Sequence, residues 1–426
     1  MIVNRLTKKR VSPAANERLE KIRKFIQENR FNRSLLRYID WPLLLIVLVL
    51  SLYGVLVIFC ATGVPVDDPS LNIFEKVQLQ SFTYPRLQLI WMAASVLVIA
   101  AAIYLDYDRF KQWSGIIYGA NIALLVFVLF MERMRGNMTG WFRWGEGRTF
   151  QPSEIAKIAI IIALANQFSN RKKPIRTVSE LIPSLLYIGL PLLLIAAQPD
   201  FGTALVYVVI YAVLLFVSGT DRKLIWGLVA IASLLIAAVF LMMNSSSSFR
   251  IDRIQVWLDP SYDSTGLGAG MQTQNARIAV ASGGLWGRGM FSQGNFASLN
   301  YIPDDHTDFI FAIVCETFGL VGAGIMVLLF VLLLMRLISL ARKAQDAFGA
   351  YVITGIAAMM FFHIFENIGM VIGVTPVTGI PLPFVSYGGS NYLTNIIGIG
   401  LVINVTMRSR ARTRKIKTRV IEPAKL

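Results

Sequence analysis

Long runs of apolar residues alternate with shorter polar segments along most of the chain. Most runs have the length that an α-helix needs to cross a bilayer, roughly 20 residues. They cover residues 41–62, 87–105, 114–131, 155–168, 181–198, 203–218, 224–243, 309–335, 351–374 and 384–405. The pattern predicts an all-α, polytopic integral membrane protein with about ten transmembrane helices and a large loop, residues 244–307, between helices 7 and 8.

Composition and charge support this class and orient it. With 55% hydrophobic and 15% charged residues, the chain does not resemble an ordinary soluble domain. If the helices alternate in direction, 30 of the 41 Lys and Arg lie on the side of the two termini. Such an excess marks the cytoplasmic side, so we expect a cytoplasmic N-terminal arm (1–40), a membrane domain (41–407) and a cytoplasmic tail (408–426). The loop 244–307 is then extracytoplasmic.

The net charge of +16 is explained by this topology and by contact of the basic ends with anionic lipid headgroups, so we expect no nucleic-acid partner. The polar, basic start of the chain is not typical of a cleavable signal. The sequence has no phosphate-binding Gly-Lys-Ser/Thr loop, no dinucleotide fingerprint and no Cys/His metal motif. Any chemistry is therefore expected to draw its energy from the substrate or from a gradient.

The segment 301–316, Tyr-Ile-Pro-Asp-Asp-His-Thr-Asp-Phe-Ile-Phe-Ala-Ile-Val-Cys-Glu, carries three aspartates and a histidine directly into an apolar helix. One interpretation is that Thr307 or Asp308 is only the N-cap of that helix. The other is that Asp308 is a functional carboxylate held at the edge of the bilayer.

A second charged group opens the short helix predicted at 155–168. Pro152 suits the first turn of a helix, and Glu154 and Lys157, three residues apart, then share one face. Charges at this depth are costly unless they are paired or functional. They either fix the end of the helix or face a polar cavity.

Further polar residues lie in the predicted external loops. Asp200, in Gln-Pro-Asp-Phe-Gly-Thr, either caps the next helix or contributes to a site. The loop 244–307 is too long to be a mere connector. It contains Arg253, Gln274 and Arg277, and its glycine-rich part, 282–289, has backbone N–H groups that could approach a phosphate or a sugar.

Two more features lie near the C-terminal end of the membrane domain. His363 and Glu366 are three residues apart inside a predicted span. They are interpreted either as an interhelical hydrogen-bonding pair or as a proton relay. The Pro/Gly-rich stretch 375–390, which contains Ser386, predicts irregular backbone lining a cavity, because a bilayer tolerates such backbone only there.

These pieces, in this order, resemble the SEDS family (shape, elongation, division and sporulation) of RodA, FtsW and SpoVE. The resemblance covers about residues 40–407 and rests on five stretches: 151–157, 198–203, 278–289, 303–311 and 378–390. The stretch Gly-Ile-Pro-Leu-Pro-Phe-Val-Ser-Tyr-Gly-Gly at 379–389 looks more like RodA than FtsW, so a role in cell elongation is expected, with division or sporulation as alternatives.

The resemblance implies a peptidoglycan glycosyltransferase that polymerises lipid II at the outer face of the bacterial cytoplasmic membrane, working with a class B penicillin-binding transpeptidase. The family's catalytic carboxylate falls on Asp308, and its important Glu and Lys fall on Glu154 and Lys157. We expect the substrate-binding residues to be Glu154, Lys157, Asp200, Arg253, Gln274, Arg277 and Ser386.

The chemistry of this reaction fits these residue types. A base must take the proton of an acceptor sugar hydroxyl while the donor loses undecaprenyl pyrophosphate. The pyrophosphate needs cations, for which Lys157, the external arginines or a divalent ion (Mg or Mn) are candidates. Two other functions stay open: a lipid II flippase that uses His363 and Glu366 as a relay, and a scaffold that recruits a transpeptidase.

Overall fold

The structure is a computed structural model that describes residues 33–64, 66, 72–135, 140, 142–144, 147–198, 200–243, 249–263, 268, 270–292, 295, 302 and 305–421. The predicted N-terminal arm up to residue 32, the last five residues, and Pro199, Pro303 and Asp304 of the family stretches lie outside the described residues.

Ten helices occupy the ten predicted apolar runs. They are α2 (Trp41–Ala61), α4 (Thr83–Tyr104), α6 (Ser114–Arg135), α7 (Pro152–Ser169), α8 (Val178–Ala197), α9 (Phe201–Val217), α10 (Arg222–Met243), α13 (Ile310–Arg342), α14 (Ala347–Ile372) and α15 (Gly389–Ile421). In the described part of the chain, six of them are long and apolar enough to cross a membrane: α2, α4, α6, α8, α13 and α14. The chain is thus a helical membrane protein.

Shorter elements join these helices. They are η2 (Arg33–Tyr38), α3 (Ile73–Gln78), α5 (Tyr107–Gln112), α11 (Phe249–Leu258), η3 (Pro260–Asp263) and α12 (Met271–Ser282). The strands β1 (Phe142–Trp144) and β2 (Gly147–Phe150) form an antiparallel hairpin before α7, so the prediction of an all-α chain holds apart from this hairpin.

The helices α7 and α14 form the centre of the bundle. Nearly every side chain of α7 is buried, and α14 packs against α7, α9, α13 and α15. A helix that is apolar on all sides belongs inside a bundle. This explains why the short apolar run at 155–168 is stable: it contacts protein over most of its surface.

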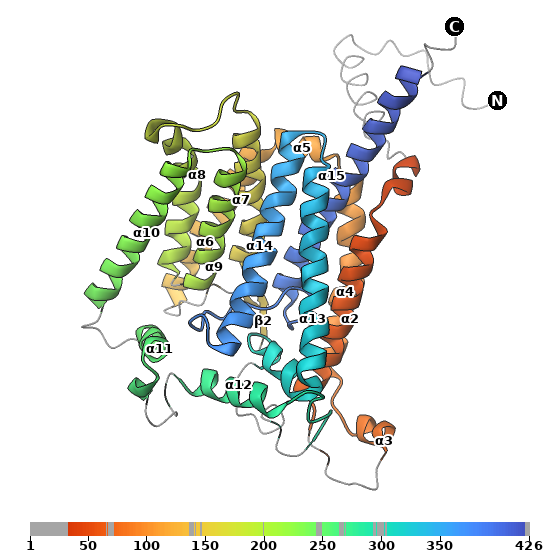
Figure 1. Cartoon of the computed structure of the whole chain (residues 1–426), viewed down its shortest axis with the longest axis vertical. Helices are drawn as coiled ribbons and strands as arrows, with labels where there is room; N and C mark the ends of the chain where they lie inside the picture. The colour runs from red at the N-terminus through yellow and green to blue at the C-terminus, as the bar shows by residue number, and fades with distance from the viewer. Residues whose placement is uncertain are drawn as a thin grey trace, which may run out of the picture.

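The two ends of the bundle differ (Figure 1). The helices α3, α11 and α12 lie at one end, whereas η2 and the C-terminal part of α15 lie at the other. At the second end, basic residues of α15 hold the bundle together: Arg408 pairs with Asp106 at 2.9 Å, and Arg412 pairs with Asp108 at 2.5 Å. These arginines bind protein carboxylates, so they are not only lipid contacts as the charge pattern suggested.

The helix α13 is broken near its start. Gly319 has φ 65° and ψ −164°, which interrupts the helical hydrogen bonds. The glycine-rich segment 283–289 closes the gap, because the N–H groups of Arg288 and Gly289 donate to the carbonyls of Glu316 and Thr317, at 2.8 and 3.1 Å. Unsatisfied backbone groups are expensive inside a membrane, so this insertion is what allows the break.

The N–H groups of residues 288 and 289 therefore bind α13 and are not available to a phosphate or a sugar. For these two groups, the predicted role in ligand binding is wrong. The glycines serve close packing: a Cβ on Gly283 would lie 1.9 Å from the Cys315 carbonyl oxygen, and one on Gly287 would lie 2.2 Å from that of Thr317. The helix α15 also differs from its prediction, since it begins at Gly389 and continues without interruption past residue 407.

Candidate active site

Asp308 lies in the turn that precedes α13. The helix begins at Ile310, and Phe309 occupies the N-cap position, with no cap hydrogen bond from its own side chain. The interpretation of Thr307 or Asp308 as the N-cap is therefore wrong. Asp308 is half-buried, next to the buried Phe309.

Three hydrogen bonds fix the backbone around Asp308. The side-chain amide of Asn367, on α14, donates to the Asp308 carbonyl at 2.7 Å and to the Ile380 carbonyl at 2.8 Å. The Tyr387 N–H donates to the His306 carbonyl at 2.9 Å. Both contacts join the turn 305–309 to the irregular loop 373–388 between α14 and α15.

The Asp308 carboxylate lies beside Gly379 of this loop. A Cβ built on Gly379 would be 3.2 Å from Asp308 Oδ2, and Gly379 has φ +74°, a conformation that suits glycine. The loop also holds Phe384 at φ 66°, which is unusual for a bulky residue. Strained backbone of this kind clusters at functional sites, and Gly379 lies directly beside the carboxylate.

Three rings surround the turn on the side of α4. Tyr84 lies 4.7 Å from the His306 ring and 5.0 Å from the Tyr387 ring, and the His306 and Tyr387 rings are 5.7 Å apart. Burial, together with the nearby Tyr84 phenol, raises the pKa of Tyr387 above its ordinary value, so its hydroxyl is neutral at pH 7.

Arg253, Gln274 and Arg277 line one pocket of about 270 Å³ between α11, α12 and the loop after α14. The residues Thr375, Pro376 and Val377 of that loop form its other wall. The Arg277 guanidinium donates to the Gly373 carbonyl at 3.3 Å, which fixes α12 against the end of α14. The loop 373–388 thus borders this pocket and, at Gly379, the Asp308 carboxylate.

Glu154 and Lys157 form a buried ion pair of 2.7 Å, with 5% and 1% of their side chains exposed. The Lys157 ammonium also lies 3.0 Å from His363 Nε2 of α14, and the Asn391 amide of α15 donates to Glu154 at 3.2 Å. The predicted pair exists, and it joins three helices. His363 therefore makes an interhelical contact, which agrees with its interpretation as part of an interhelical hydrogen-bonding pair.

The hydrogen bonds of Glu366 connect it to the loop 373–388. Its carboxylate accepts a hydrogen bond from the Thr378 hydroxyl at 2.9 Å, and its backbone carbonyl accepts one from Thr375 at 3.4 Å. Both partners belong to the loop that borders Asp308. The polar residues of α14 thus hold this loop from the inside of the bundle.

Asp200 caps α9, where its carboxylate accepts the Thr203 N–H at 3.0 Å. It also accepts from the Gln151 side chain at 3.1 Å, which connects the start of α9 to the start of α7. Ser386 is buried, and its hydroxyl donates to the Thr307 carbonyl while accepting from the Leu382 N–H. Both residues make supporting contacts around the site.

Sequence reasoning missed several residues of this arrangement. Asn367 and Asn391 are polar side chains in apolar helices, which is a sign of function inside a membrane. Asn367 is completely buried, and it is the residue that contacts the Asp308 backbone. The roles of Thr378 and Gly379 depend on the path of an irregular loop, which no periodicity predicts.

The structure offers no ready metal site in the residues that it describes, since no three His, Cys, Asp or Glu side chains there form a group that could hold an ion. Asp305 and His306 contact each other at 3.2 Å near Asp308, and no third such side chain joins them into a ligand group in the described part of the chain. A divalent cation at this site would therefore need phosphate oxygens of the substrate among its ligands.

Comparison with known proteins assigns the chain to a family. The FtsW, RodA and SpoVE family of cell cycle proteins matches residues 41–411, which is most of the chain. The chain belongs to this family. Among its relatives is the peptidoglycan glycosyltransferase MrdB of Escherichia coli K12, 36% identical over 373 residues, or 86% of this chain and 93% of MrdB.

Two solved structures also resemble this chain. One, of a peptidoglycan synthase complex that coordinates polymerization and crosslinking, has a TM-score of 0.69 and 29% identity, covering 87% of this chain and 98% of the other. The other, the rod shape determining protein RodA of Thermus thermophilus, has a TM-score of 0.60 and 26% identity, covering 86% and 96%. The family resemblance noted from the sequence is confirmed.

Proposed function

We propose that this protein is a peptidoglycan glycosyltransferase that polymerises lipid II into β-1,4 glycan strands during cell elongation, with undecaprenyl pyrophosphate as the leaving group. The name of the MrdB relative supports the activity. The similarity to a rod shape determining protein, together with the sequence of the loop 379–389, supports elongation over division or sporulation.

One observation carries this proposal: a single loop, 373–388, borders both the Asp308 carboxylate and the pocket lined by Arg253 and Arg277. A glycosyl transfer from a pyrophosphate donor needs a base at the acceptor hydroxyl and cations at the leaving group. The carboxylate and the two guanidinium-bearing residues border the same loop, which supports assigning to them the two functions that this reaction requires.

The mechanism assigns the base to Asp308. Its carboxylate takes the proton of the acceptor sugar hydroxyl as that oxygen attacks the anomeric carbon of the donor. The bond between the anomeric carbon and the pyrophosphate oxygen breaks, and the electron pair leaves with the pyrophosphate. A single displacement inverts the α-linked donor into a β linkage, and the energy comes from cleaving the donor's own bond to its pyrophosphate.

We assign substrate binding to the pocket and support to the buried groups. Arg253, Gln274 and Arg277 would contact the pyrophosphate or the sugars of lipid II, since guanidinium groups suit phosphate oxygens. Lys157 is almost fully buried and contacts Glu154 and His363, so it acts by holding α7 and α14 in place. Asp200 and Ser386 position the loops in the same way. Glycan synthesis with and without added Mg or Mn measures whether the reaction needs a divalent cation.

For the topology, we propose ten spans, with α7, α9, α10 and α15 added to the six long apolar helices. The protein is then a multi-pass component of the bacterial cytoplasmic membrane. Both termini are cytoplasmic, which agrees with the location of η2 and the end of α15 at one end of the bundle (Figure 1). The large loop 244–307, between the seventh and eighth spans, places α11 and α12 at the outer face, where lipid II is used.

We further propose a class B penicillin-binding protein as the partner, which would crosslink the strands that this chain makes. The support is the similarity to the solved synthase complex that joins polymerization to crosslinking. The main alternative function, a lipid II flippase, would use the buried contact between Lys157 and His363 as part of a proton path.

The experiment that separates these functions supplies purified lipid II to the protein in liposomes and measures both glycan chains and lipid movement between leaflets. The transferase predicts glycan chains from the wild type, with a higher KM for lipid II in Arg253→Gln and Arg277→Gln. Transport of lipid II without any glycan, with or without the partner, would favour the flippase instead.

A further inference from the structure

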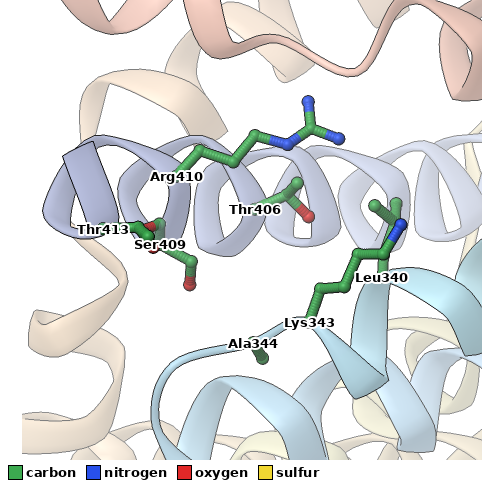
Figure 2. Close-up of a pocket in the computed structure, with 7 residues that line it drawn as sticks. All are labelled: Leu340, Lys343, Ala344, Thr406, Ser409, Arg410 and Thr413. Carbon is green, nitrogen blue, oxygen red and sulfur yellow. The ribbon is translucent and has the colours of Figure 1, made fainter. Parts of the chain in front are cut away.

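A second polar pocket lies at the opposite end of the bundle from Asp308, between the end of α13 and the C-terminal half of α15. Its volume is about 410 Å³, and its lining residues are Leu340, Lys343, Ala344, Thr406, Ser409, Arg410 and Thr413 (Figure 2). Neither the proposed transferase mechanism nor the family stretches use these residues. The pocket combines hydroxyl groups, cationic residues and two apolar side chains.

The Thr406 hydroxyl is the sharpest sign that a ligand belongs here. Thr406 is only 6% exposed, and its Oγ1 has no hydrogen-bond partner among the described residues. A buried hydroxyl without a partner is costly, so such groups usually have one. In Figure 2 this hydroxyl points toward the side of the pocket on which the Lys343 ammonium lies.

The charge around the pocket is positive. Arg410 and Arg336 both bind the buried Asp40 carboxylate, Arg336 at 2.9 and 2.6 Å. Two guanidinium groups thus share one carboxylate, which leaves one positive charge. Lys343, which is exposed, adds another. Because Asp40 is held by both arginines, it does not oppose an anion at the pocket.

The remaining lining residues favour a phosphate bonded to an apolar group. Ser409 accepts a hydrogen bond from the Gln345 N–H at 3.5 Å, and its own O–H can still donate. Leu340 and Ala344 provide apolar contact beside these donors. The helix α13 also exposes apolar side chains such as Met335 and Ile338 within two turns of Leu340, which is the surface that acyl chains cover in a bilayer.

We propose that this pocket binds the headgroup phosphate of an anionic phospholipid in the leaflet at this end of the bundle. Lys343 supplies the charge, and the Thr406 and Ser409 hydroxyls donate to phosphate oxygens. Positive residues near a membrane surface attract anionic lipids, and the pocket turns that general attraction into a defined site. The proposal stands independently of the transferase activity.

Native mass spectrometry of the purified full-length protein tests the proposal, with phosphatidylglycerol and phosphatidylcholine as competing probes. We expect the wild type to retain phosphatidylglycerol over phosphatidylcholine. Lys343→Gln and Thr406→Val are each expected to weaken this retention by about fivefold, whereas Thr406→Ser, which keeps the hydroxyl, retains it. Arg342→Gln is the matched control, because it removes one charge from the same helix end without changing a lining residue.

Three outcomes would overturn the proposal. The first is equal binding of the two lipids by the wild type. The second is the same loss in Arg342→Gln as in Lys343→Gln, which would indicate only a general surface charge. The third is displacement of the lipid by inorganic phosphate, but not by chloride at matched ionic strength, which would make free phosphate the ligand. Size-exclusion profiles confirm that each variant is folded.

Discussion

The Ser386 hydroxyl donates a hydrogen bond to the Thr307 carbonyl at 2.5 Å, 79 residues away in the chain. Thr307 is the residue before Asp308, so this bond joins the loop in front of α15 to the carboxylate proposed as the base. The same hydroxyl accepts the Leu382 N–H at 2.8 Å. Ser386 therefore holds the two backbone segments of the site together.

Replacing Ser386 by alanine leaves the Leu382 N–H and the Thr307 carbonyl without this partner. We expect a loss of about 1–3 kcal/mol in stability and a fall in kcat for lipid II polymerisation that is larger than the change in KM, because Asp308 is misplaced. Thermal unfolding in detergent and steady-state kinetics measure the two effects. An unchanged kcat in Ser386→Ala would show that the bond does not position the base.

Because Glu154 and Lys157 form a buried ion pair, we expect a single variant of the pair to lose more stability than the double variant. Lys157→Met leaves the Glu154 carboxylate buried without its cation, which typically costs about 3–5 kcal/mol. The double variant Glu154→Gln/Lys157→Met removes both charges, and we expect it to recover much of the lost stability. Unfolding temperatures of the two variants test this difference.

The activity of the same double variant separates two roles of the pair. If the pair only holds α7 and α14 in place, polymerisation should recover together with stability. A double variant that is as stable as the wild type but makes no glycan would contradict the supporting role and would give Lys157 a direct part in the reaction.

The break in α13 makes a prediction about two neighbouring glycines. Gly287→Ala places a Cβ 2.2 Å from the Thr317 carbonyl at φ +84°, whereas Gly284→Ala, at φ +55°, meets no atom within 4 Å. Both substitutions place alanine in a left-handed backbone conformation, which costs about 1–2 kcal/mol. Only the Cβ of Gly287→Ala also clashes with another atom. We expect a clearly lower unfolding temperature for Gly287→Ala, and equal temperatures would show that segment 283–289 does not pack into the break.

Asp40 makes the stability of the protein depend on pH in the acidic range. Burial opposes its charge, but hydrogen bonds from Arg336 and Arg410 outweigh that effect and hold the pKa of Asp40 below its ordinary value of about 3.9. Because the pKa of Asp40 is lower in the folded state, its charged form stabilises the protein at pH values above the ordinary pKa. This contribution is lost as the pH falls from the ordinary pKa toward and through the folded-state pKa. Unfolding temperatures between pH 6 and pH 3 should fall less steeply in Asp40→Asn than in the wild type. Parallel curves would contradict this role.

The helical frame was predictable because the bilayer imposes it. Runs of apolar residues of spanning length have few alternatives, and helices such as α2 and α14 begin and end close to their predicted limits. The break at Gly319 was not predictable, because it lies within one continuous apolar run and exists only where the distant segment 283–289 reaches it.

The candidate site was predictable residue by residue but not as an arrangement. Asp308, Arg253 and Arg277 are polar residues at positions where polarity is costly or a loop is long, so the sequence marks them. The placement of Asp308 beside the loop 373–388 depends on Asn367 and on the turn at Gly379, and that of Arg277 depends on its contact with Gly373. These are long-range contacts, and no local pattern in the chain encodes them.

The most direct test of the account compares the wild type with Asp308→Asn in polymerisation of purified lipid II, each with and without a class B penicillin-binding protein. Asparagine preserves the shape of the side chain but cannot act as a base at neutral pH. The account predicts long glycan chains from the wild type and none from Asp308→Asn, while lipid II binding and the unfolding temperature stay close to those of the wild type. Glycan synthesis by Asp308→Asn at the wild-type rate would contradict the assignment of Asp308 as the base.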